Sequence, residues 1–102
     1  MVVNIDLAKK RIAALQRYVD LTESYQPKTL NERIIKEYAI TGSIQKTVNM
    51  VNKLGYEIDD RSYESKDVSA VINSNPRKSD DELHRIVRKF YRKKIKSNNT
   101  FL

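Results

Sequence analysis

Apolar residues recur every three or four positions along several segments of this chain, which is the spacing of one face of an α-helix. In residues 4–25 the steps alternate between three and four, and residues 44–54 and 65–73 carry two shorter stripes. The pattern predicts an all-α or mostly α fold in a single domain. The expected elements are, in order, a long N-terminal helix at residues 4–25, a helix-turn-helix unit at 29–75, a C-terminal helix at 79–96 and a frayed tail at 97–102.

Residues that favour helix ends stand at the expected boundaries. Gly55 follows the last apolar residue of the 44–54 segment and is expected to end that helix with a positive φ. Side chains that accept hydrogen bonds from free amides stand at the starts of the helices. They are Asn4, Thr29 with Glu32, Ser43, and Ser79 with Glu82.

The connection between the 44–54 and 65–73 segments has the pattern of a short β-hairpin at residues 56–63. Two aspartates, Asp59 and Asp60, stand at its centre, and aspartate tolerates the backbone that a tight hairpin turn requires. The residues that we expect to pair across the turn are Tyr56, Ile58, Arg61 and Tyr63.

Residues 44–76 resemble the DNA-binding recombinase segment of large serine recombinases, in which a helix ends in N-x-x-G and a serine-started helix ends near N-P. The matching positions are Asn52, Gly55, Tyr56, Arg61, Tyr63, Ser65, Val68, Ile72, Asn75 and Pro76. The resemblance implies a shared way of folding and of binding DNA. Nothing in the chain resembles the catalytic domain of that family, so recombination chemistry is not implied. More weakly, residues 37–56 resemble the opening helix-turn-helix of small terminase subunits, which form rings and recruit a packaging motor.

The distribution of charge favours an anionic partner. The chain of 102 residues has a formal net charge of +7, yet residues 28–72 contain seven basic and seven acidic residues. Residues 85–96 contain seven basic residues and no acidic one. Because such cations repel one another unless an anion lies against them, we expect double-stranded DNA as the partner. The candidates for contacts to the DNA backbone are Lys46, Arg61, Tyr63, Arg85, Arg88, Lys89, Arg92, Lys93 and Lys96.

The segment at residues 65–73 has one apolar face and one polar face, as a recognition helix requires. Asparagine can pair with adenine and lysine can reach guanine in the major groove. The candidates for contacts to base edges are Ser65, Lys66, Ser69 and Asn73.

The N-terminal stripe permits two interpretations. It packs on the chain's own core, or its alternation of three and four steps forms a coiled-coil seam between two copies. The residues of the second interpretation, which we take as candidates for dimerisation, are Ile5, Ala8, Ile12, Leu15 and Val19.

Catalytic patterns are weak in this sequence. The chain has no cysteine, and we interpret its one histidine, His84, as a surface residue. Asp59, Asp60 and Asp67 stand next to basic residues, which favours a solvated region over a metal site. We therefore expect no enzymatic activity, no metal and no cofactor. No apolar run approaches the length of a membrane span, and the N-terminus lacks the order of a secretion signal, so a cytoplasmic location is expected.

Together these patterns favour a sequence-reading DNA-binding protein of a phage or mobile element, acting as a transcriptional regulator or a recombination accessory factor. Two alternatives remain open. One is an oligomeric DNA-packaging adaptor similar to a small terminase subunit, and the other is an inhibitor that binds a host protein through the N-terminal stripe.

Overall fold

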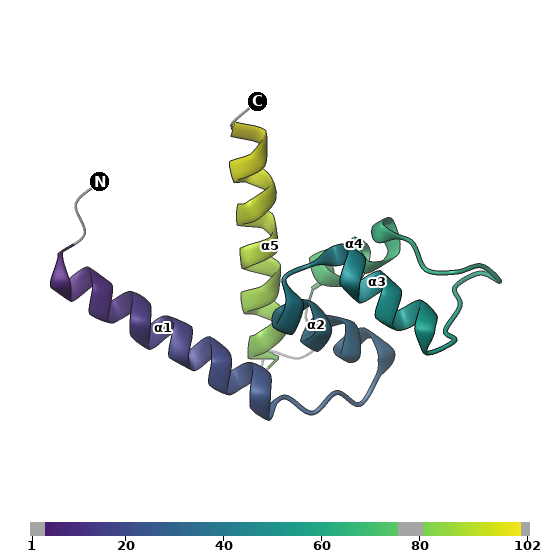
Figure 1. Cartoon of the computed structure of the whole chain (residues 1–102), viewed down its shortest axis with the longest axis horizontal. Coiled ribbons are helices and arrows are strands. Elements are labelled where there is room, and N and C mark those ends of the chain that lie inside the picture. The colour runs from purple at the N-terminus through teal and green to yellow at the C-terminus, as the bar shows by residue number, and fades with distance from the viewer. Residues whose placement is uncertain (1–3, 76–80, 101–102) are drawn as a thin grey trace.

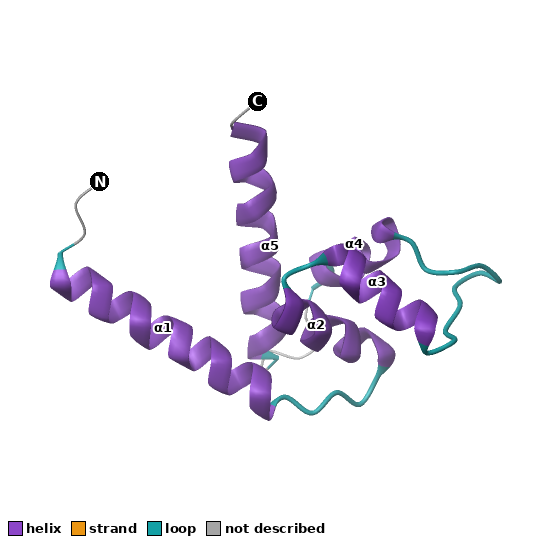
Figure 2. Cartoon of the chain, viewed as in Figure 1, coloured by secondary structure: helices purple, strands orange, loops and turns teal. Residues whose placement is uncertain are grey.

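The computed structural model describes residues 4–75 and 81–100, which form five helices (Figure 1). Figure 2 shows that this described part contains no strand, so the prediction of an all-α fold is confirmed. The helices are α1 (Ile5–Ser24), α2 (Leu30–Thr41), α3 (Ile44–Lys53), α4 (Ser65–Asn73) and α5 (Glu82–Thr100).

The predicted caps of the first three helices are present. The side chains of Asn4, Thr29 and Ser43 accept hydrogen bonds from the third amide beyond each of them, at 2.8, 3.2 and 3.1 Å. The second half of the expected Thr29 box differs, because the Glu32 carboxylate accepts from the amide of Lys28. A backbone amide that no helix bond satisfies gains a partner in each case.

Acidic side chains accept hydrogen bonds from backbone amides at the starts of the last two helices. α4 begins at Ser65, but its N-cap residue is Glu64, whose amide donates to the Asp67 carboxylate at 2.8 Å. Ser79 lies outside the described residues. At the start of α5 the Asp81 carboxylate accepts from the amide of His84 at 3.1 Å.

The connection from α3 to α4 contains the predicted turn in a reduced form. Gly55 has φ +89°, and Asp59 and Asp60 have φ +51° and +61°. Ile58 and Arg61 form a single antiparallel bridge with two backbone hydrogen bonds of 2.8 and 3.0 Å.

The longer ribbon that we expected from Tyr56 to Tyr63 does not form. The side chain of Asn52 explains the difference, since it bonds to both backbone groups of Tyr63. Its Oδ1 accepts from the amide at 2.8 Å and its Nδ2 donates to the carbonyl at 3.1 Å. The chain therefore leaves the hairpin after Arg61 and turns into α4.

Four helices bury a common core, in which α2, α3 and α4 pack on one another and α5 covers α2 and α4. The aromatic rings of Tyr38 and Tyr91 meet edge to face inside it, with centroids 5.8 Å apart. The buried apolar residues are Ile34, Ile35, Tyr38, Ala39, Val48, Val51, Val68, Ile72, Leu83, Val87 and Tyr91.

α1 packs on this core only through its second half. Tyr18 donates a hydrogen bond to the Ala39 carbonyl at 2.9 Å and stacks on Phe90 at 5.3 Å. Arg17 donates to Glu82. The first half of α1 leaves the body and diverges from α5 (Figure 1). The interpretation that the whole N-terminal stripe packs on the chain's own core is therefore wrong, because the stripe passes beyond the edge of that core.

The C-terminal helix is longer than expected. α5 continues to Thr100, so residues 97–100 are helical and not a frayed tail, and residues 101–102 lie outside the described part. Neither glycine nor proline follows Lys96 to stop the helix. Ile95 is 40% exposed because α5 has by then passed the end of the core.

Candidate nucleic-acid interface

Most of the described cationic side chains of α5 project from the side of the helix that faces away from the core, and Lys94 is an exception. Leu83, Val87 and Tyr91 bury the inner side, so the residues between them at helical spacing project outward. We call these outward cations the basic ridge. It consists of Arg85, Arg88, Lys89, Arg92 and Lys93. Within the described residues, Arg88, Lys89, Arg92 and Lys93 make no ion pair with an acidic side chain.

Arg88 and Lys94 each contact the body of the protein. Arg88 is half-buried, and its Nε is buried without a hydrogen-bond partner in the described part of the chain. Lys94 donates from Nζ to the carbonyl of Gly42, the residue that ends α2, at 3.4 Å. The expected contact Lys96 belongs to α5, but its side chain lies outside the described residues.

The basic ridge meets α4 at one side-chain pair. The Nε of Arg92 donates to Oδ1 of Asn73 at 3.1 Å, and its Nη2 reaches the Asn73 carbonyl at 3.5 Å. A cation at the C-terminal end of α4 also complements the negative end of that helix dipole. The contact makes the exposed side of α4 continuous with the basic ridge.

The exposed side of α4 is a stripe of three residues at steps of four and three. Lys66 has a side chain that is 72% exposed, Ala70 is exposed, and Asn73 is half-buried beneath Arg92. The sequence interpretation missed Ala70, although helical spacing from Lys66 was the signal that identifies it. An alanine methyl can contact the methyl group of thymine in the major groove.

The four candidates for base contacts do not share one face. Ser65 and Lys66 are exposed at the start of α4. Ser69 instead points toward α5, where its hydroxyl lies 2.9 Å from the hydroxyl of Tyr91, a side chain that is only 9% exposed. The structure thus brings Ser69 into the contact between α4 and α5 and away from the outer stripe.

The candidates for backbone contacts outside α5 also divide. Lys46 is exposed in the first turn of α3. Tyr63 packs against the core, and its backbone is bound by Asn52. Arg61 binds Asp67 through two hydrogen bonds of 2.8 and 2.9 Å and also donates to the carbonyl of Ser62. Its guanidinium therefore already has acceptors inside the chain.

This ion pair changes the electrostatics at the start of α4. The hydrogen bonds from Arg61 lower the pKa of Asp67 to about 2, with a smaller contribution from the amide of Glu64. The same pair raises the pKa of Arg61. Both groups stay charged at neutral pH, so the pair as a whole adds no net negative charge near the α4 stripe.

His84 is not a surface residue, and that interpretation is corrected. Its side chain is buried, and Nε2 lies 3.2 Å from the carbonyl of Ile72 in the last turn of α4. The histidine therefore joins the start of α5 to the end of α4.

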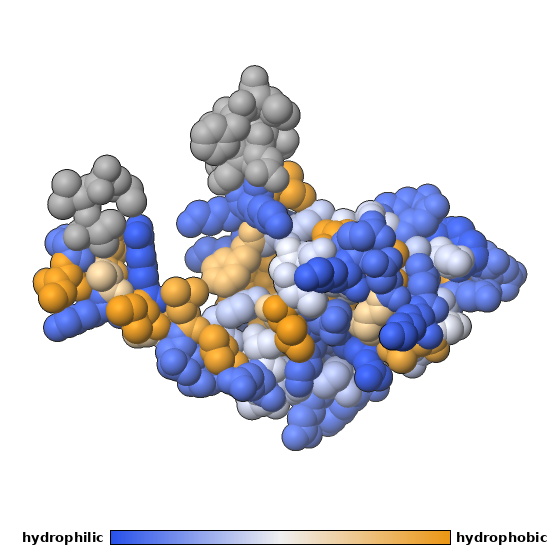
Figure 3. All heavy atoms as spheres, in the orientation of Figure 1, coloured by the Kyte–Doolittle hydropathy of each residue, from blue (hydrophilic) through white to orange (hydrophobic). Residues whose placement is uncertain are grey.

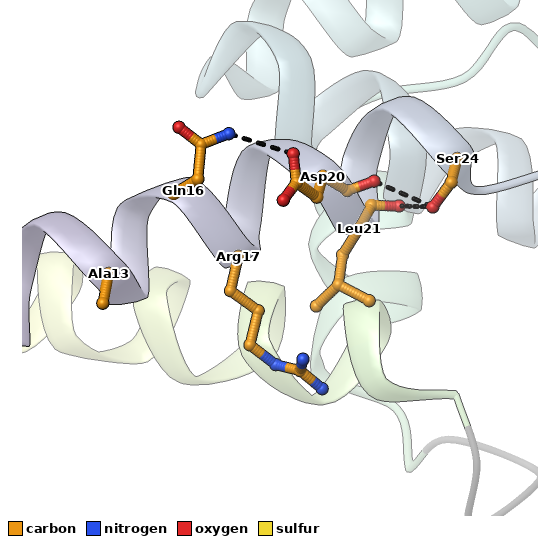
Figure 4. A pocket seen from close by; sticks show the side chains of 6 residues that line it. All are labelled: Ala13, Gln16, Arg17, Asp20, Leu21 and Ser24. Carbon is orange, nitrogen blue, oxygen red and sulfur yellow. Dashed lines mark hydrogen bonds between the residues drawn. The ribbon is translucent and has the colours of Figure 1, made fainter.

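Two shallow hollows of the described surface offer no convergent chemistry. The first, of about 400 Å³, lies along α1, where Ala13, Arg17 and Leu21 point to one side (Figure 4). Arg17 is bound to Glu82, and the other polar side chains bond within the helix. The second, of about 380 Å³, lies between α5 and the turn from α2 to α3 at Gly42.

The described residues contain no group of three or more histidine, cysteine, aspartate or glutamate side chains placed to hold a metal ion. Among the helices of the described part, none is both long enough and apolar enough to cross a membrane. Comparison of the chain with protein-family models, with curated proteins and with solved structures found no match.

Proposed function

We propose that the protein binds double-stranded DNA through one surface formed by the outer stripe of α4 and the basic ridge of α5. The observation that carries this proposal is the bond between Arg92 and Asn73, because it places the two parts side by side. In this proposal the protein acts as a transcriptional regulator or a recombination accessory factor of a phage or mobile element.

The two parts have different tasks. The ridge neutralises phosphates and releases counterions, which gives affinity without regard to sequence. The α4 stripe of Lys66, Ala70 and Asn73 faces base edges. α4 has nine residues, a length of about 13 Å, which suits a short recognition helix in the major groove.

Several positions that resemble the recombinase segment have a clear structural role in this chain. Asn52 holds the backbone of Tyr63, Gly55 takes a positive φ, and Arg61 binds the first turn of α4. Matching positions therefore fix how α3 leads into α4. They support a shared local fold, with base contacts carried by other residues.

A DNA-packaging adaptor is the second candidate. An inhibitor that binds a host protein is the third. The exposed apolar stripe on α1 favours both, since a protein partner would cover it. Measurement of mass in solution separates packaging from regulation, because a large ring indicates packaging, whereas a monomer or dimer indicates regulation. A pull-down from host lysate after nuclease treatment tests the inhibitor.

The proposal is tested by removing two cations from the ridge. Lys89→Gln together with Lys93→Gln should weaken binding to a labelled random duplex by roughly 10- to 100-fold at about 0.1 M salt, and should reduce the slope of log K against log salt by about 2. Fluorescence anisotropy over a salt series gives both values.

The matched control is Lys28→Gln together with Arg33→Gln. These residues are exposed cations outside α4 and α5, and their removal changes the net charge by the same amount. Any loss of affinity or slope in the control measures the effect of net charge alone. We expect this loss to be smaller than the loss in the ridge variant. Equal losses in the two variants would contradict the assigned interface.

A further inference from the structure

The part of α1 that leaves the body carries an apolar stripe that the chain itself does not cover. Ile5 is 70% exposed, Ile12 66%, Leu15 61% and Val19 44%, with the smaller Ala8 between them. In contrast, Ile34 and Ile35 of the core are 0% and 1% exposed. Figure 3 shows hydrophobic side chains along this projecting part of α1.

The stripe is narrow, as in a seam between two helices. Its five residues follow one another at alternating steps of three and four, which is the a/d pattern of a coiled coil. The pattern ends where the chain's own core begins, because the next position, Thr22, is buried and bonds to the carbonyl of Tyr18. The free seam thus runs from Ile5 to Val19.

The charges beside the seam indicate which partner fits it. Lys9 and Arg11 flank the seam in the first half of α1, where they outnumber the one acid, Asp6, whereas Asp20 and Glu23 stand near its end. Arg17, the cation nearest to those acids, is bound to Glu82 of α5. The helix therefore has a cationic end and an acidic end on either side of an apolar centre.

We infer that two copies of the chain pair through α1 in antiparallel orientation. A parallel pair would place the cations around Lys9 against the same cations of the second copy. An antiparallel pair brings Lys9 near Asp20 of the second copy, twice by two-fold symmetry. Self-complementarity of this kind selects a second copy over an unrelated protein.

The register follows from the seam. With Ile12 against Leu15 of the second copy, Ala8 lies against Val19 of that copy, and a small residue meets a larger one. The two points where α1 enters its own body, near Asp20, then lie about 20 Å apart along the helix pair. The two bodies then occupy opposite ends of the pair.

The experiment is sedimentation equilibrium of the full chain across a range of concentrations. The wild type should reach about 24 kDa, twice the chain mass of 11.9 kDa. Ile12→Ser with Leu15→Ser should stay a monomer with an unchanged helical circular dichroism spectrum, because both side chains are already exposed in the single chain. Ile40→Ser, at a position 60% exposed on α2, is the matched control and should remain a dimer.

Orientation is tested by charge reversal. Lys9→Glu alone or Asp20→Lys alone should raise the dissociation constant of the dimer roughly 3- to 10-fold, and the two changes in one chain should restore it. A wild type that stays monomeric, a larger ring, a double swap that fails to restore pairing, or dimers that survive Ile12→Ser with Leu15→Ser would each overturn the inference. This pairing does not rest on DNA binding, so either can fail alone.

Discussion

The ion pair between Arg61 and Asp67 joins the connection that precedes α4 to the first turn of that helix. Asp67 belongs to the first turn of α4, where its carboxylate accepts from Arg61 and from the amide of Glu64. Its side chain is only 8% exposed, so the carboxylate has exchanged water for these donors. A carboxylate that accepts several hydrogen bonds is stabilised in its charged form.

Stability should therefore depend on pH through Asp67. Its folded-state pKa, about 2, lies below the ordinary 3.8, so the carboxylate stabilises the fold above pH 3.8 and this contribution is lost as the pH falls from 3.8 toward about 2. Asp67→Asn should unfold at lower urea concentration than the wild type at neutral pH. The gap between the two urea midpoints should shrink over that acidic interval, and a gap that stays constant would show that Asp67 is not the titrating group.

The role of a side chain could be predicted from the sequence where its hydrogen-bond partner lies a few residues away. Asn4 and Ser43 cap helices through amides three residues away, so spacing alone identifies them. Ser69 and His84 could not be assigned in this way, because their partners, Tyr91 and Ile72, lie 22 and 12 residues away. Whether a polar side chain faces solvent or a neighbouring helix depends on packing that periodicity does not contain.

At the scale of elements, the connection between α3 and α4 determines how α4 is held. It has a positive φ at three positions, a single bridge and one side-chain clamp, so little apolar burial stabilises it. The amide of Asn52 is the clamp, since it satisfies a donor and an acceptor of Tyr63 at once.

Asn52→Ala should cost about 2 kcal/mol in the free energy of unfolding, because two part-buried backbone groups lose their partner. The matched control is Asn49→Ala on the same helix. Asn49 is exposed and bonds only to Gln45 among the described contacts, so that change should cost less than about 0.5 kcal/mol. Urea unfolding gives both values, and equal costs would contradict the role of the clamp.

The helices themselves were largely predictable, but what covers each of them was not. α1 begins and ends within one residue of the expected range, since caps and periodicity are local. The same periodicity continues through residues that the core buries, such as Thr22, and residues that it leaves exposed, such as Ile12. An apolar stripe predicts that a face will be covered and does not identify what covers it.

At the scale of the whole molecule, a charged helix, α5, contacts the end of a nearly neutral unit that contains α4. The chain carries seven basic residues at 85–96 and balanced charge at 28–72, and the fold places the two regions in contact at Arg92 and Asn73. The outer stripe of α4 and the basic ridge therefore form one continuous surface. Pairing through α1 would present that surface twice, which predicts a target site with two-fold symmetry.

The central claim is that α4 and α5 contact the same duplex, and site-directed DNA cleavage tests it most directly. The chain has no cysteine, so Ala70→Cys on α4 and Lys89→Cys on α5 each give one site for an iron chelate that cuts nearby DNA. On a duplex selected from random sequences, both labels should cut within one footprint, and a label at Lys28→Cys should produce no localised cuts. Cleavage from the α5 label without cleavage from the α4 label would contradict the account.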